Sequence, residues 1–199
     1  NTRDKIHNGS LILLGAAYLW IGAVDLLHTV SYKGMGVLQD ADADTATQLW
    51  ITARYIESAT LAAAPLLAGR RLPMPRVVWA YTGLFVLAVA VIFVWPVFPT
   101  CYVEGQGLTP FKKISEYVIA GILVAGLGNL TARRQHFEHG VFRRLVASIL
   151  LTIASELLFT FYVDVYGLSN LLGHLCKLVS FWLIYKAIIE TGLQEPYNL

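Results

Sequence analysis

Six long apolar segments, each close to the length of a membrane-spanning helix, are the feature that most restricts how this chain can fold. A helix that crosses a bilayer needs about 20 mainly apolar residues. Only 14% of the 199 residues are charged, whereas soluble domains carry about 25%. We therefore predict an all-α fold, a polytopic membrane helix bundle of about six transmembrane helices, with residues 1–199 forming one domain. The predicted spans are Gly9–Val30, Thr45–Ala68, Val77–Phe98, Phe111–Thr131, Leu145–Val165 and Leu168–Ile189.

The basic residues between the predicted spans indicate how the chain is oriented. They gather on one side of the bundle, and cytoplasmic loops carry the excess of Lys and Arg in membrane proteins. These residues are Arg3, Lys5, Arg70, Arg71, Arg76, Arg133, Arg134, Arg143, Arg144 and Lys186. The other side holds Lys33, Lys112 and Lys113, so we expect it to face outward. Because the chain begins without Met and ends on a polar tail, we also expect it to be part of a longer protein.

Ionisable residues inside the predicted spans concentrate toward the outer side. Each costs about 2.5–3.5 kcal/mol at the centre of a membrane helix, so such residues usually have a function. Many recur three or four positions apart, as Arg54 and Glu57 do, which places them on one helix face. The predicted ligand-binding residues are Asp25, His28, Trp50, Arg54, Glu57, Cys101, Glu116, Glu156, Asp164, Asn170, His174 and Lys177.

Two interpretations of this polar cluster compete. In the first, the charges only neutralise one another: Arg54 would pair with Glu57 or Asp25, and Lys177 with Glu156 or Asp164. In the second, the cluster binds a ligand. A bundle does not need so many ionisable groups at one level merely to stay assembled, so we favour the second interpretation.

A transition-metal ion is one candidate ligand. The histidines and carboxylates suit zinc, copper, iron or nickel, although no local motif such as HExxH joins them. The predicted metal ligands are His28, Glu57, Glu156, Asp164 and His174. Haem held between the two histidines is a less favoured cofactor, and Cys101 in an outer loop is a candidate soft ligand or redox group.

Several other functions have little support in the sequence. There is no G-x-S-x-G, phosphate loop or HExxH motif, so we do not expect the domain itself to be an enzyme. Transporters usually contain internal repeats, which we do not find. Cys101 and Cys176 form no CxxC pair, and the basic residues follow membrane topology, which argues against a nucleic-acid partner.

Five motifs, in order along the chain, resemble those of the third type of bacterial membrane-associated sensor (MASE) domain. They are Asp25–Met35, Trp50–Glu57, Cys101–Lys112, Ser155–Asp164 and Gly173–Gly192. The resemblance implies a signal-input domain of the bacterial inner membrane, N-terminal to a histidine kinase or a cyclic-di-GMP enzyme in the same chain. It also implies one further N-terminal helix, and it leaves the ligand undefined. A homodimer is the assembly that we expect.

The motif residues and the polar cluster are largely the same residues, so we predict a ligand site that opens to the periplasm. The loop Cys101–Thr109 would form its lid, and occupancy would shift the last span and so signal to the cytoplasm. Two alternatives stay open. The protein would be a redox protein that holds haem or quinone near His28 and His174, or a structural anchor for the output domain.

Overall fold

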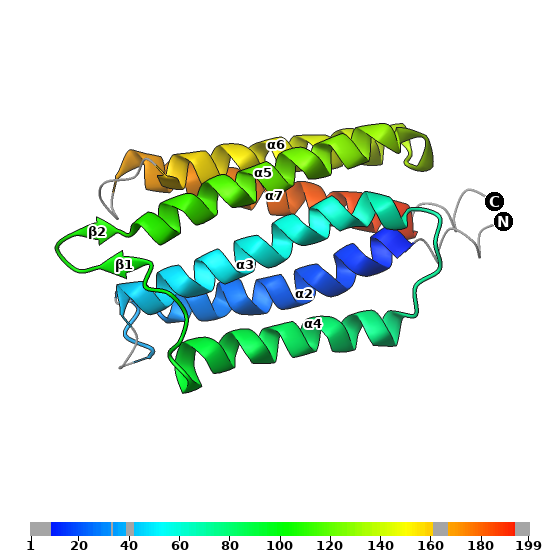
Figure 1. Cartoon of the computed structure of the whole chain (residues 1–199). Helices are drawn as coiled ribbons and strands as arrows, with labels where there is room; N and C mark the ends of the chain where they lie inside the picture. Colours follow the sequence, from blue (N-terminus) through cyan, green and yellow to red (C-terminus); the bar gives the residue numbers. More distant parts are fainter. Residues whose placement is uncertain (1–8, 33, 39–41, 161–166, 194–199) are drawn as a thin grey trace.

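The computed structural model describes residues 9–32, 34–38, 42–160 and 167–193, with side chains as far as residue 189 (Figure 1). Within these ranges the chain forms a bundle of long helices, and the prediction of an all-α membrane bundle is confirmed. The long helices are α2 (Gly9–Val30), α3 (Ala43–Ala63), α4 (Met74–Val89), α5 (Pro110–Ala132), α6 (His139–Thr160) and α7 (Leu168–Leu193). Short elements are the 3₁₀ turns Ala64–Leu67 and Arg134–His136, the π turn Ala90–Val94, and strands β1 (Tyr102–Val103) and β2 (Gly107–Leu108).

Four helices in the described part of the chain are long and apolar enough to cross a membrane, fewer than the six spans predicted. They are α2, α4 with its π turn, α5 and α7. Helix α3 carries Asp44, Arg54 and Glu57, which lower its average hydropathy although Arg54 and Glu57 are fully buried. Helix α6 contains Arg143 and Arg144. Hydropathy counts such residues as polar, whereas the fold removes several of them from the surface by packing them against other helices.

The helix bounds follow local chemistry. Helix α3 ends at Ala63 and continues as a 3₁₀ turn, because Pro65 has no N–H to donate to an α-helical hydrogen bond. The second predicted span, which ran to Ala68, therefore combines two elements. Asp42 caps the start of α3 by accepting a 2.7 Å hydrogen bond from Thr45 N. The end of the fifth predicted span, at Val165, lies outside the described residues.

The helices pack in two groups that meet mainly along α3 and α5 (Figure 1). Helix α2 packs on α3 and α4, whereas α6 packs on α5 and, most extensively, on α7. Gly126 of α5 permits the close approach, because a Cβ at this position would lie 3.0 Å from Ala62 Cα on α3. Asn129 Nδ2 reinforces the contact by donating a 3.0 Å hydrogen bond to Ala62 O. Contact between α7 and α2 is sparse by comparison, so the two groups are less tightly joined on that side.

A short β-hairpin closes one end of the bundle, opposite the end where α2 begins and α7 ends (Figure 1). We call this end the hairpin end. Asp44 Oδ1 accepts hydrogen bonds from Cys101 N at 2.6 Å and Tyr102 N at 2.7 Å, which anchors β1 on the first turn of α3. Gly105 and Gly107 supply the positive φ angles, 80° and 86°, that the tight turn requires. The hairpin is therefore held over the helix ends at the side predicted to face outward.

Hydroxyl groups join α6 to α7 from the middle of the two helices toward the hairpin end. Ser180 Oγ lies 2.8 Å from Ser148 Oγ and 2.7 Å from Thr152 Oγ1, and Ser155 Oγ donates a 2.9 Å hydrogen bond to Gly173 O. In lipid, packing and hydrogen bonds of this kind hold helices together, because apolar burial gives little driving force there. Helices α6 and α7 therefore behave as one packed unit.

Candidate functional site

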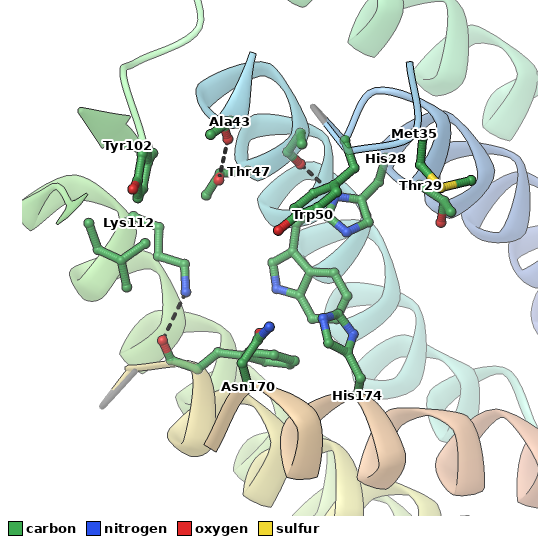
Figure 2. A pocket seen from close by; sticks show the side chains of 14 residues that line it. His28, Thr29, Met35, Ala43, Thr47, Trp50, Tyr102, Lys112, Asn170 and His174 are labelled. Carbon is green, nitrogen blue, oxygen red and sulfur yellow. Dashed lines mark hydrogen bonds between the residues drawn. The ribbon is translucent and has the colours of Figure 1, made fainter. Parts of the chain in front are cut away.

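A pocket of about 310 Å³ opens at the hairpin end, among helices from both groups (Figure 2). Its walls come from the outer ends of α2, α3 and α7, from α5 and α6, and from the hairpin. The residues that line it are His28, Thr29, Tyr32, Met35, Ala43, Ala46, Thr47, Trp50, Tyr102, Leu108, Lys112, Phe159, Asn170 and His174. The volume lies at the lower end of the range of about 300–1,000 Å³ that is typical of small-molecule sites.

Trp50 forms the centre of the pocket. Figure 2 shows its indole between His28 of α2 and His174 of α7, with ring centroids 5.4 and 5.3 Å away. Phe159 of α6 packs edge-on at 4.7 Å, and the guanidinium of Arg54 lies 4.6 Å from the centroid of the same ring. Trp50 therefore touches the pocket and also a charged group on its own helix, one turn further into the bundle.

The hydrogen-bonding state of three polar side chains in the pocket can be assigned from their surroundings. Trp50 is 7% exposed, and its Nε1 has no hydrogen-bond acceptor among the described residues. His28 Nδ1 lies 2.7 Å from Ala46 O, which can only accept, so Nδ1 carries the proton and Nε2 keeps its lone pair in the neutral ring. Lys112 Nζ lies 2.5 Å from Glu116 Oε1 and donates a 3.2 Å hydrogen bond to Phe159 O.

A network of buried charges lies below the pocket, and we call it the ion network. Its first part joins α2 and α3. Arg54 Nη2 lies 2.5 Å from Asp25 Oδ1, Arg54 Nη1 lies 2.5 Å from Glu57 Oε2, and Tyr18 Oη donates a 3.0 Å hydrogen bond to Glu57. Removing one partner from such a buried pair leaves an uncompensated charge inside the bundle, and this destabilises the fold far more than burying the intact pair does.

The second part of the ion network reaches α5, α6 and α7. Lys177 of α7 contacts Glu57, and its Nζ lies 3.7 Å from Glu156 Oε1. The carboxyl group of Glu156 in turn faces that of Glu116, which pairs with Lys112 at the pocket. The network thus links five helices and begins and ends near the pocket.

The structure divides the predicted site residues into two adjoining sets. His28, Trp50, Asn170 and His174 line the pocket. The ion network contains Asp25, Arg54, Glu57, Glu116, Glu156 and Lys177. Asp164 lies outside the described residues. The two sets meet at Trp50 and Arg54, which are in contact through the indole ring.

Cys101 is fully buried at the base of the hairpin and is not part of the pocket lining. Its Sγ donates to Pro99 O at 3.4 Å. Burial, with a smaller contribution from the charge of Asp44, raises the pKa of this thiol to about 12. A thiol in this state is a poor ligand and a poor nucleophile at neutral pH.

Sequence reasoning missed several residues of the site. Tyr18 precedes Asp25 by two helical turns and so shares its face, a spacing that would have predicted its contact with the network. Phe159 follows Glu156 by three residues and reaches the pocket. Lys112 was noted as polar but not assigned to the site. No sequence pattern indicates that Tyr102 and Leu108 line the pocket, because only the folded hairpin brings them over the helix ends.

The arrangement bears on the metal and haem hypotheses. Among the residues that the structure describes, no three His, Cys, Asp or Glu side chains lie close enough to hold a metal ion. The two histidines are in the pocket, whereas Glu57 and Glu156 are engaged by Lys177 below it. The space between the imidazoles is filled by Trp50, which leaves no gap for a haem plane.

Comparison with known proteins gives the family. A family model described as MASE3, membrane-associated sensor domain, matches residues 1–196. Neither a curated protein nor a solved structure matches the chain. The match covers every helix described above, and it confirms the resemblance found in the five motifs. The four apolar helices agree with a multi-pass protein in contact with lipid. This chain belongs to the MASE3 family and is a membrane-associated sensor domain.

Proposed function

We propose that this sensor domain binds a small ligand in the pocket at the hairpin end and reports occupancy through the position of α7. The output is a cytoplasmic histidine kinase or cyclic-di-GMP enzyme in the same chain, which acts as a homodimer. The pocket opens on the side predicted to face the periplasm, so the ligand arrives from outside the inner membrane. The hairpin, anchored by Asp44, forms the lid.

One observation carries the proposal: Trp50 lines the pocket and is also in contact with the ion network through Arg54. On the pocket side it touches His28 and His174, and its ring also lies 4.6 Å from the Arg54 guanidinium. A ligand that displaces the indole therefore also disturbs the central cation of the network.

The ion network offers two arrangements for α7. Lys177 contacts Glu57 on α3 and lies 3.7 Å from Glu156 on α6. Moving the α6–α7 pair away from α3 would favour Glu156 as the partner of Lys177, whereas moving it closer would favour Glu57. A ligand shifts this balance only by the difference between its affinities for the two arrangements.

Helix α7 is suited to carry such a shift across the membrane. Its 26 residues extend from the pocket to the opposite end of the bundle, a length of about 39 Å at 1.5 Å per residue. The hydroxyl contacts with α6 make the pair move together, and the sparse contact with α2 leaves that side free to adjust.

A variant that fills the pocket tests the proposal without a known ligand. Thr47→Trp adds an indole to the pocket lining, whereas Ala59→Trp adds the same bulk to an exposed site on the same helix. We expect Thr47→Trp to change the output activity of the full-length protein in proteoliposomes several-fold and Ala59→Trp to leave it unchanged. Equal output from both folded variants would instead support a structural anchor.

A further inference from the structure

The polar groups in the pocket select for the sign of a ligand's charge. We infer that the ligand is a small planar aromatic anion, of the class of the aryl carboxylates. This inference rests on the proposed function, because it assigns the ligand class of the same pocket. Three features carry it: two hydrogen-bond donors, the absence of Asp and Glu from the described part of the lining, and aromatic walls of limited size.

The first donor is the indole N–H of Trp50. Trp50 is only 7% exposed, and its Nε1 has no hydrogen-bond acceptor among the described residues. An indole nitrogen can only donate. A buried donor without an acceptor costs about 1–3 kcal/mol, so a ligand that supplies an acceptor atom here gains affinity.

The second donor is the ammonium group of Lys112, which lines the same pocket. It forms an ion pair with Glu116, whose Oε1 lies 2.5 Å from Nζ, and it donates one of its three N–H groups to Phe159 O at 3.2 Å. A lysine ammonium has three donors and no acceptor. The third N–H is therefore available to a second acceptor, and a carboxylate presents two oxygens that suit Trp50 and Lys112 together.

The charges around the pocket disfavour a cationic ligand. The described lining contains Lys112 but neither Asp nor Glu. The indole ring of Trp50, which would otherwise attract a ligand ammonium, already has the Arg54 guanidinium 4.6 Å from its centroid. A cation in the pocket would therefore meet the ammonium group of Lys112 in the lining, whereas Glu116, Asp25 and Glu57, which pair with Lys112 and Arg54, do not line the pocket.

The walls define the body of the ligand. Trp50, Phe159, Tyr102 and the two imidazoles present aromatic surface, against which rings pack in stacked or edge-on geometry. A cavity of about 310 Å³ accommodates one or two fused rings, not a lipid chain or a macrocycle. A planar ring with a carboxylate directed at Lys112 satisfies the walls and both donors.

Three probes of the same shape and different charge test the inference. They are 4-fluorobenzoate, 4-fluorobenzamide and 4-fluorobenzylammonium, and binding to the protein in lipid nanodiscs is followed by ¹⁹F NMR. We expect the benzoate to bind saturably, the amide about tenfold or more weakly, as for loss of a charge-assisted hydrogen bond, and the ammonium not to compete.

Variants assign the binding to these donors. Trp50→Phe keeps the ring and removes the N–H, and we expect it to weaken benzoate binding about tenfold. Lys112→Gln combined with Glu116→Gln removes a neutral pair and is expected to abolish the preference for benzoate over benzamide. Lys113→Gln, on the exposed face of α5, is the matched control and should bind as wild type does.

The outcomes separate this inference from the proposed function. Binding of the ammonium probe at least as tight as that of benzoate overturns the anionic class, and so does benzoate binding that neither variant changes. If the amide and ammonium probes bind in the pocket instead, the pocket is still a ligand site and the proposed function stands. Failure of the proposed function shows as unchanged output in Thr47→Trp.

Discussion

Lys177 is the residue whose loss should perturb the domain most, because it balances two buried carboxylates on different helices. Its side chain contacts Glu57, and its Nζ lies 3.7 Å from Glu156 Oε1. At an effective dielectric constant of about 20, two opposite unit charges about 4 Å apart attract by about 4 kcal/mol. Lys177→Met removes this attraction while Glu57 and Glu156 stay buried.

We expect Lys177→Met to lower the free energy of unfolding by about 3–5 kcal/mol, the usual cost of removing one partner from a buried ion pair. At about 1.4 kcal/mol per factor of ten, the folded population falls relative to the unfolded by about two to more than three orders of magnitude. The assay is reversible denaturant unfolding in mixed micelles, followed by circular dichroism. Lys113→Met, at an exposed position, is the control and should change stability by less than about 0.5 kcal/mol.

Charge balance gives a sharper test. The ion network as described has three cations, Arg54, Lys112 and Lys177, and four acids, Asp25, Glu57, Glu116 and Glu156. Combining Lys177→Met with Glu57→Gln leaves two cations and three acids, the same excess of one acid as in wild type. The double variant should therefore be more stable than Lys177→Met alone. A loss below about 1 kcal/mol in Lys177→Met, or strictly additive effects of the two changes, would refute this account of the network.

Two further predictions concern the hairpin end. Because burial raises the pKa of Cys101 to about 12, its thiol stays almost entirely protonated between pH 7 and 9. We therefore expect maleimide labelling at Cys101, measured by mass spectrometry, to stay slow across that range. Labelling should accelerate in Asp44→Ala, because this change removes the acceptor that anchors the hairpin. A labelling rate in the folded protein that levels off near pH 9, as for a thiol that is already ionised there, would contradict the first part. Thr109 caps α5 by accepting from Lys112 N at 3.3 Å, so Thr109→Ala should cost about 1 kcal/mol in unfolding assays, whereas Thr109→Ser should retain most of the stability.

Much of the helical architecture could be predicted from the sequence. The span predicted at Gly9–Val30 coincides with α2, and the last span begins at Leu168 as predicted. These bounds were accessible because apolar length and helix-ending residues act locally. The number of transmembrane helices was predicted less well. Helix α3 buries Arg54 and Glu57 against its neighbours, and burial of this kind does not register in a hydropathy average.

The pairing of the polar residues shows which contacts could be predicted from spacing along one helix and which could not. Helical spacing predicted that Arg54 and Glu57 lie on one face, and they form a 2.5 Å ion pair. For Lys177 the sequence predicted Glu156 or Asp164 as the partner. Its Nζ does lie 3.7 Å from Glu156 Oε1, but it also contacts Glu57, 120 residues away, which helical spacing did not indicate. The difference arises because the choice of partner depends on which helices are neighbours.

The sequence by itself determined that this chain is a bundle of membrane helices with ionisable groups toward one end, because apolar length and intrahelical spacing are properties of each segment alone. Only the tertiary structure decided that these groups separate into a pocket and an ion network, with Trp50 between them. The close contact of Gly126 with Ala62 and the docking of the hairpin on Asp44 set the distances between helices. Those distances come from side chains far apart in the chain packing together, which no single segment contains.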